Sequence, residues 1–385
     1  MERFDVLVVG AGPAGSAAAI HLARGGARVL LADRARFPRD KPCGGGLTGR
    51  ALRHVPCDVS PVVERVVDRF VLRVGYRTHF ARRSETPLVL MTQRRRLDAF
   101  LAEQAAAAGV EFWDGAGVGD MALESTEATA RVGSSRVRAS YVIGADGANG
   151  VVARAAGLGE GIRCGVALEG NVSWDVLSGA SSRGAPYRDS AWVELGVVPG
   201  GYGWVFPKGD HANLGVGGWL AQGPRLRSHL ARLAREHGVD PEHLQGVRGH
   251  RLPMRAPGSS VGRENVLLVG DAAGLVDPLS GDGIYEAFVS ARLAAEAVLA
   301  GRPQGYETAL SGALDRHAAA SWKGKRAADR FPRACFWAVR APGVFEAVAG
   351  LLRGDLTHPG DARGLARPPL RVLSRLASGS ARSLT

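Results

Sequence analysis

The chain has 385 residues, 45% of them hydrophobic, which is enough for one large domain or two interleaved domains and excludes a disordered chain. Four scattered cysteines without a CxxC pair (Cys43, Cys57, Cys164 and Cys335) exclude a disulfide framework and a structural zinc site, and favour a reducing compartment. The formal net charge is +12, but only four of the 49 basic residues are lysines, so we interpret most of this charge as arginine-rich composition.

The first predicted element is a strand over Asp5–Val9, and no secretory leader precedes it. The sequence also contains no run of 18 apolar residues that would span a bilayer. We therefore expect a cytoplasmic protein. We expect no nucleic-acid partner, because no recognition motif accompanies the positive charge.

The stretch "FDVLVVGAGPAGSAAAIHLARGGARVLLADR" predicts a strand, a helix from Pro13 and a second strand over Val29–Ala32. Its G-x-G-x-x-G motif provides a tight turn, a close approach of backbone to a pyrophosphate, and close packing of helix on strand. Asp33 ends the second strand, where an acid accepts hydrogen bonds from ribose hydroxyls. We therefore predict dinucleotide binding by Gly10, Gly12, Ala14, Gly15, Asp33 and Arg34.

A loop with the sequence "KPCGGGLTGR" follows at Lys41–Arg50. Its consecutive glycines allow backbone to approach a planar ligand without an intervening Cβ, and they allow the loop to move. Cys43 is either a functional residue of this loop or a small residue in a flexible turn. Lys41 is one of the four lysines in a chain that otherwise uses arginine, which suggests that a compact ammonium is needed here.

Four further stretches of the sequence carry patterns that bear on function. Residues 92–118 predict a helix and then a strand over Val110–Trp113, and "YVIGADGANGVVAR" predicts a strand that leads into Asp146-Gly147. In "GYGWVFPKGDHANLGVG" two strands flank a turn, and the alternation places Tyr202, Trp204 and Phe206 on one side of a sheet, as core or as the wall of an apolar tunnel. A last apolar strand ends at Gly270-Asp271, before a helix that opens near Gly283 and Ile284.

The G-x-G-x-x-G unit and the two later Gly-Asp or Asp-Gly motifs together resemble the FAD-dependent oxidoreductases that include the aromatic hydroxylases. That resemblance implies that Asp146 and Asp271 lie at the cofactor, with Asp271 on the ribityl chain. It implies that the helix at Gly283 and Ile284 points its positive end at the flavin. It also places an arginine four residues before Asp98 on the cofactor, which is Arg94, with Arg95 and Arg96 as competitors. Val118 falls where the backbone of that family meets adenine.

Two short motifs narrow the resemblance to the geranylgeranyl reductase family of flavoproteins. Its Cys-x-Gly-Gly loop is matched at Cys43–Gly46 and its Tyr-x-Trp-x-Phe-Pro-Lys motif at Tyr202–Lys208, and the likeness extends over about Met1–Gly301. The resemblance implies that Cys43, Gly44 and Gly46 lie against FAD. It also implies that Tyr202, Trp204, Phe206 and Lys208 serve the substrate.

The expected fold is α/β, or α+β overall: a Rossmann-like FAD-binding domain interleaved with a β-sheet substrate domain, followed by a helical extension. We predict the FAD-binding domain at 1–55, 86–157 and 252–310, the substrate domain at 56–85 and 158–251, and the extension at 311–385. We expect the last residues, from Arg367, to be frayed. The extension has 13 basic and 5 acidic residues, which fits either peripheral contact with the inner face of a membrane or a solvated surface.

The resemblance implies an FAD-dependent reductase that saturates C=C bonds of an isoprenoid lipid or polyprenyl substrate. Only one dinucleotide motif is present, so the electron donor is expected to be transiently bound NADPH or a ferredoxin. Cys43, or a water molecule near it, is the candidate proton donor. A flavin-dependent monooxygenase or halogenase and an electron-relay flavoprotein are the alternatives. No His or Cys cluster predicts a metal site.

Overall fold

The computed structural model describes residues 1–180, 187–256, 258–362 and 364. Its largest sheet has eight strands. In spatial order the main path is β17 (Gly262–Arg263), β18 (Val266–Leu268), β11 (Ser135–Gly144), β1 (Glu2–Val9), β2 (Val29–Ala32) and β8 (Glu111–Trp113), and β10 (Ala128–Val132) and β9 (Val118–Leu123) extend it from β11.

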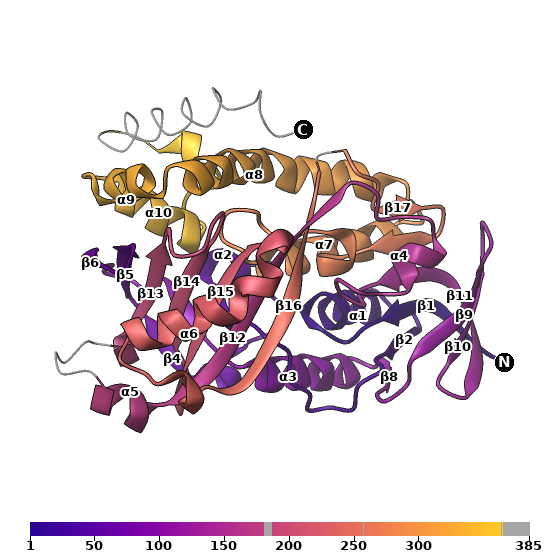
Figure 1. Cartoon of the computed structure of the whole chain (residues 1–385). Helices are drawn as coiled ribbons and strands as arrows, with labels where there is room; N and C mark the ends of the chain where they lie inside the picture. Colours follow the sequence, from indigo (N-terminus) through magenta and orange to yellow (C-terminus); the bar gives the residue numbers. More distant parts are fainter. Residues whose placement is uncertain (181–186, 257, 363, 365–385) are drawn as a thin grey trace.

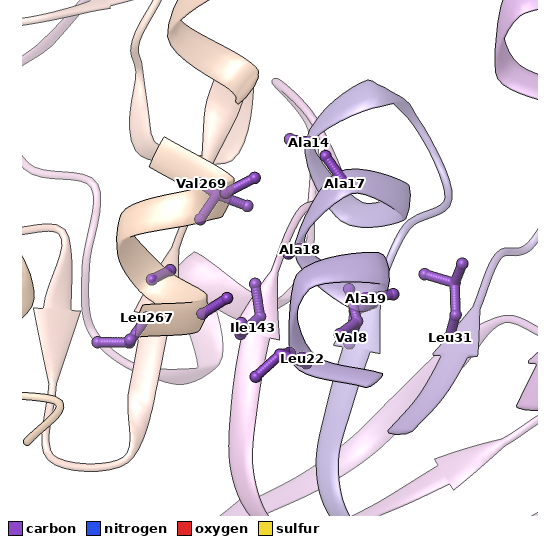
Figure 2. Close-up of a cluster of buried hydrophobic side chains, with 14 of the residues drawn as sticks. Val8, Ala14, Ala17, Ala18, Ala19, Leu22, Leu31, Ile143, Leu267 and Val269 are labelled. Carbon is purple, nitrogen blue, oxygen red and sulfur yellow. The ribbon is translucent and has the colours of Figure 1, made fainter. Parts of the chain in front are cut away.

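The five strands from β18 to β8 are parallel, and β1 lies between β11 and β2. Helix α1 (Pro13–Arg24) packs over them through small side chains. Figure 2 shows Ala18 and Leu22 of this helix beside Val8 and Ile143 of the strands, and Ala14, Ala17 and Leu267 belong to the same buried cluster. The chain passes from β1 to β2 on one side, and the later strand β11 lies on the other side of β1. The strand order therefore reverses at β1, and its carboxyl end is a topological switch point, where open α/β sheets bind ligands.

The second sheet has seven strands and is mostly antiparallel. Its order is β16 (Gln245–Arg255), β12 (Ile162–Ser173), β15 (His211–Trp219), β14 (Tyr202–Pro207), β13 (Ser190–Leu195), β5 (Arg69–Val74) and β6 (Thr78–Arg83). Helix α6 (Leu226–Glu236) packs on one face, where Leu230 and Leu233 meet Val205 and Leu214 in a buried cluster. The opposite face is therefore available to line a cavity.

The strands of a small third sheet alternate along the chain with strands of the two large ones. It consists of β3 (Gly46–Thr48), β7 (Val89–Met91) and β4 (Arg65–Val67). Its strand β3 continues directly from the glycine loop, and Gly46 pairs with Met91. The loop that the sequence singled out is thus anchored at one end in a sheet.

The remaining helices complete the layers. They are α2 (Gly49–Leu52), α3 (Arg94–Ala107), α4 (Val152–Ala155), α5 (Trp174–Ala180), α7 (Ile284–Leu299), α8 (Gly305–Arg330), α9 (Pro332–Arg340) and α10 (Val344–Arg353). Figure 1 shows α8, α9 and α10, in orange and yellow, along the upper edge of the molecule. None of the described helices is by itself long and apolar enough to cross a membrane. Among them, α9 and α10 together have the required length and composition, and the two helix axes meet at a bend of 92°.

The structure confirms the expected fold class, a Rossmann-like parallel sheet combined with a second β-sheet unit and C-terminal helices. The predicted domain boundaries stay a prediction, and two elements cross them. Strand β16 runs through the boundary at 252, and α8 starts at Gly305, before the predicted start of the extension at 311. A helix continues for as long as its backbone hydrogen bonds are made, whatever the change in composition. The predicted fraying falls on Arg367–Thr385, outside the described residues.

Candidate functional site

A cavity of about 1400 Å³ lies between the two large sheets. On one side it is lined by the loops that follow β1 and β11, and on the other by the face of the second sheet opposite α6. This volume exceeds the roughly 300–1000 Å³ of most small-molecule sites, so the cavity has room for more than one ligand.

The turn after β1 has the geometry that the glycine motif predicts. Gly10 adopts φ +100°, and a Cβ there would lie 2.4 Å from the carbonyl oxygen of Ala145. A Cβ at Gly15 would lie 1.8 Å from the carbonyl oxygen of Gly10, so Gly15 permits close packing of helix on strand and does not itself line the cavity. Asp33 accepts hydrogen bonds from the backbone N–H groups of Ala11 (2.8 Å) and Ala35 (2.9 Å), and its carboxylate lines the cavity.

Two arginines face the backbone of Gly12. A Cβ at Gly12 would lie 3.5 Å from Nη2 of Arg39 and 3.7 Å from Nη2 of Arg94, with no closer neighbour. Both guanidinium groups are held by the buried carboxylate of Asp98, Arg94 through two hydrogen bonds of 2.7 and 2.8 Å and Arg39 through one ion pair of 2.7 Å. Burial opposes the charge of Arg94, but its pairing with Asp98 is the stronger effect and raises the pKa of Arg94.

The three adjacent arginines of α3 differ in burial and position. Arg94 is buried and lines the cavity, whereas Arg95 and Arg96 are exposed and Arg96 pairs with Glu64. Sequence reasoning missed Arg39, which no motif marks. Two positive groups above a glycine at a helix N-terminus fit the pyrophosphate of a dinucleotide, so the residues present fit FAD at this end of the cavity.

Two carboxylates that the sequence assigned to the cofactor also line the cavity. Asp146 caps α4, because its Oδ2 accepts hydrogen bonds from the N–H groups of Val151 (2.5 Å) and Val152 (3.0 Å), and burial raises its pKa. Asp271 Oδ2 contacts Lys41 Nζ at 2.9 Å and His250 Nε2 at 3.3 Å. Burial of Asp271 opposes ionisation, but Lys41 and His250 prevail and hold its pKa well below the usual range.

The glycine loop is tied down by a buried lysine. Lys208 is 2% exposed, and its ammonium donates hydrogen bonds to the carbonyl oxygens of Gly44 (2.5 Å) and Thr92 (2.8 Å). Gly45 has φ +71°, and a Cβ there would lie 2.0 Å from Lys208 Nζ. The sequence assigned Lys208 to the substrate; in the structure its three-donor head binds backbone and shapes the loop.

Glu169 on β12 is a cavity-lining acid that sequence reasoning missed. Its Oε1 accepts a hydrogen bond of 2.7 Å from the N–H group of Cys43, which brings it against the loop. Burial raises the pKa of Glu169 above its ordinary value. A single acidic residue in the middle of a strand, "VALEGNV", was the available signal, but only the pairing of the sheets shows that it faces Cys43.

The aromatic side chains of β14 form one wall of the cavity. Tyr202, Trp204 and Phe206 all line it, whereas Val205 between them belongs to the cluster under α6. The ring of Trp204 lies over Gly215 of β15, where a Cβ would come within 2.0 Å of the ring. Nε1 of Trp204 donates a hydrogen bond of 2.8 Å to Oδ1 of Asn213. Strand alternation and one cross-strand glycine therefore turn the three rings toward the cavity.

The C-terminal helices supply a further part of the wall. The part of α8 that lines the cavity carries small residues and four charged ones, Arg316, Lys323, Lys325 and Asp329, and α9 and α10 add apolar residues. The lining residues of these helices include Ala319, Ala320, Gly324, Ala327, Ala328, Cys335, Val339, Val344, Phe345, Val348 and Leu352. The extension, to which the sequence assigned no site residue, is thus part of the site.

A buried polar cluster lies beside the N-terminus of α7. Asp277, Glu286 and His317 have potential ligand atoms within 4.8 Å of one another, an arrangement that sequence reasoning did not anticipate. Arg50 Nη1 lies 2.7 Å from His317 Nε2 and Nη2 lies 3.9 Å from Glu286 Oε1, so the chain's own guanidinium supplies a positive charge beside the cluster. Burial raises the pKa of Glu286 well above its usual value.

Most of the residues predicted for the site line this one cavity. Those that do are Gly10, Gly12, Ala14, Asp33, Arg34, Cys43, Gly44, Gly46, Arg94, Asp146, Tyr202, Trp204, Phe206, Asp271, Gly283 and Ile284. Gly15, Val118 and Lys208 are not among its lining residues. Val118 starts β9 and pairs with Val132, so its backbone is engaged in the sheet. The ligand contacts of all these residues stay predictions.

Comparison with known proteins gives a consistent result. Residues 3–180 match the model of a family described as FAD binding domain. The chain is 35% identical over 340 residues to a menaquinone reductase of Mycolicibacterium smegmatis, covering 82% of this chain and 81% of that protein. It is 32% identical over 328 residues to a geranylgeranyl diphosphate reductase of Rhodobacter capsulatus, with 82% and 81% covered.

Solved structures agree on the fold. A geranylgeranyl bacteriochlorophyll reductase-like protein of Thermoplasma acidophilum superposes with a TM-score of 0.75 at 24% identity, covering 99% of this chain and 96% of that one. A flavin-dependent brominase superposes with a TM-score of 0.77 at 19% identity, covering 98% of this chain and 99% of that one. At these identities the likeness speaks for the architecture alone.

Proposed function

The chain belongs to the geranylgeranyl reductase family of FAD-dependent oxidoreductases, and from this premise we propose that it saturates C=C bonds in the prenyl chain of an isoprenoid lipid. Relatives named for menaquinone, geranylgeranyl diphosphate and digeranylgeranylglycerophospholipid share a prenyl chain and differ in the head group. The prenyl chain is therefore the feature on which the proposal rests.

The observation that carries the proposal is the single cavity shared by the dinucleotide-binding loops and an apolar compartment. Away from the residues that fit FAD its walls are mostly apolar, built from the β14 aromatics, Leu72, Met91 and Leu252, and α9–α10, with charged side chains such as Arg50, Arg316 and Lys323 also lining it. A long hydrocarbon gains free energy on entering such a space, at about 25 cal/mol per Å² of apolar surface buried. Exclusion of water also protects a hydride donor and a cationic transition state.

Reduction of an isolated alkene adds one hydride and one proton across the double bond. FAD, bound and reduced, supplies the hydride. The protein supplies the proton and holds the alkene in place. Glu169 is the better-placed donor, because burial favours its protonated form, it lines the cavity, and its Oε1 already accepts from Cys43 N–H. Cys43 itself, the donor that the sequence suggested, lies beside it on the loop.

Two finer points belong to the same proposal. The electron donor is NADPH, bound transiently, or a ferredoxin, since the sequence contains one dinucleotide motif. The enzyme also makes a peripheral contact with the membrane in which prenyl lipids reside.

The test is reduction of a prenyl substrate under anaerobic conditions. The FAD-loaded enzyme is reduced with dithionite and incubated with geranylgeranyl diphosphate or a menaquinone, and mass spectrometry follows the product. We expect the mass to rise by two hydrogens for each bond reduced. Products that contain oxygen or halogen and form only in air would instead identify a monooxygenase or halogenase and refute the proposal.

A further inference from the structure

Helix α9 has a face that does not belong to the cavity. Pro332, Cys335 and Val339 line the cavity, and Phe336 is fully buried with its ring edge-on to Phe80 of β6 at 5.2 Å. The rest of the helix points away from these contacts. The solvent-facing side of a surface helix usually carries only polar or charged residues. On α9 that side also carries the exposed aromatic residue Trp337.

We define the docking face as Arg330, Phe331, Arg333, Trp337 and Arg340. Arg333, Trp337 and Arg340 are spaced i, i+4 and i+7, so they lie along one side of α9. Trp337 is 54% exposed and Phe331 is 36% exposed. In the part of the chain that the structure describes, the other exposed large hydrophobic residues are aliphatic. Both aromatic residues therefore fall within one stretch of seven residues.

The charge of this surface has one sign. The stretch Arg330–Arg340 contains no Asp or Glu. The guanidinium of Arg340 lies 5.0 Å from the centre of the Trp337 ring, and that of Arg330 lies 5.6 Å from the centre of the Phe331 ring. The preceding acid, Asp329, is already paired with Lys325 and accepts a hydrogen bond from Trp219 at 2.8 Å.

Strand β6 adds charge of the same sign. Arg82 is exposed and lies 5.3 Å from the centre of the Phe80 ring, on the side of β6 that faces α9 through Phe80 and Phe336. Aromatic rings combined with arginines, on a helix too short to cross a bilayer by itself, form the pattern of an element lying at a membrane interface.

We propose that the docking face binds the surface of a bilayer containing anionic lipids. The inference rests on the proposed function in one respect only, because α9 also lines the substrate cavity and would bring its apolar interior next to the lipid. Each arginine near an anionic surface strengthens partitioning by about fivefold. Two exposed rings add interfacial contact but too little apolar area for insertion, so the binding is peripheral and sensitive to salt.

The test is co-sedimentation of the full-length FAD-loaded protein with sucrose-loaded vesicles of phosphatidylcholine, with or without 30% phosphatidylglycerol. We expect binding to the anionic vesicles, weakened by salt. Arg333→Glu with Arg340→Glu should reduce that binding by more than about 25-fold. The matched control is Arg95→Glu with Arg136→Glu, which changes the net charge equally on α3 and β11, away from α9 in Figure 1. The control should stay within about twofold of wild type.

A second variant guards against misfolding of the charge reversal. Trp337→Ser changes no charge and should lower binding severalfold with unchanged FAD content. Equal loss in the control, or no binding by the wild type, overturns the proposal. The proposal is also overturned if sedimentation equilibrium shows a dimer that Trp337→Ser dissociates, while the variant still binds vesicles. The docking face would then join two copies of the chain. Turnover on detergent-dispersed substrate is measured in parallel, so that an inactive enzyme is distinguished from one that fails to bind vesicles.

Discussion

Glu169, a half-buried side chain, is the residue whose substitution tests the proposed chemistry most directly. It lines the cavity, its Oε1 accepts from Cys43 N–H, and burial raises its pKa. A general acid contributes about a hundredfold or more, so Glu169→Gln should lower alkene reduction by at least about 100-fold while FAD content is kept. Cys43→Ser is the comparison. A loss for Cys43→Ser and none for Glu169→Gln would return the acid role to Cys43.

The raised pKa of Glu169 gives a pH dependence of known sign. The carboxyl donates only while protonated, so turnover should fall as the pH rises through its raised pKa and should be retained below it. In Glu169→Gln this alkaline limb should disappear from the residual rate. The measurement is the rate of a single turnover of dithionite-reduced enzyme at several pH values. An unchanged limb in the variant would show that another group titrates.

Asp271 tests the cofactor end of the site at the same scale. Its carboxylate lines the cavity and is held ionised by Lys41 and His250. A hydrogen bond to a charged group contributes about 1.5–3 kcal/mol, so Asp271→Ala should weaken FAD binding by roughly 10- to 150-fold. Flavin fluorescence on titration of apoprotein measures this. Asp271→Asn keeps an acceptor and should lose less; full FAD affinity in the alanine variant would contradict the assignment.

At the scale of elements, one ammonium group joins the glycine loop to Thr92, the residue that follows β7. Lys208 donates to Gly44 and Thr92 from a fully enclosed position. Lys208→Met leaves two carbonyl groups without a donor, which should lower the free energy of unfolding by about 2 kcal/mol or more and disturb the loop against FAD. Thermal unfolding of the apoprotein measures the first effect. Lys323→Met, the same substitution at an exposed position of α8 that borders the cavity, should leave the free energy of unfolding unchanged.

At the scale of the whole molecule, the C-terminal helices determine how much prenyl chain the cavity holds. Ala320 of α8 lines the cavity, and Ala313 of the same helix is exposed. Ala320→Phe should fill part of the cavity, raise KM for a 20-carbon substrate more than for a 10-carbon one, and leave FAD bound. Ala313→Phe is the matched control. Equal effects of the two substitutions on KM would show that the prenyl chain of the substrate does not lie beside Ala320.

The sequence by itself determined the local architecture. The glycine spacing, the apolar strands and the terminal acid of the βαβ unit each act over a few residues, and the structure reproduces them in β1, α1, β2 and Asp33. The alternation of Tyr202, Trp204 and Phe206 also placed the three rings on one side of β14, because side-chain direction in a strand is a local property. The resemblance to the geranylgeranyl reductase family also came from short motifs, Cys43–Gly46 and Tyr202–Lys208.

Only the tertiary structure decided which distant groups meet. Arg39 and Arg94 share Asp98, Glu169 reaches Cys43, and Lys208 holds Gly44 rather than facing the cavity. The C-terminal helices close the cavity although no motif in them suggested a site. Such contacts join residues far apart in the chain, and their partners depend on sheet order and packing, which a sequence pattern with a period of a few residues cannot encode.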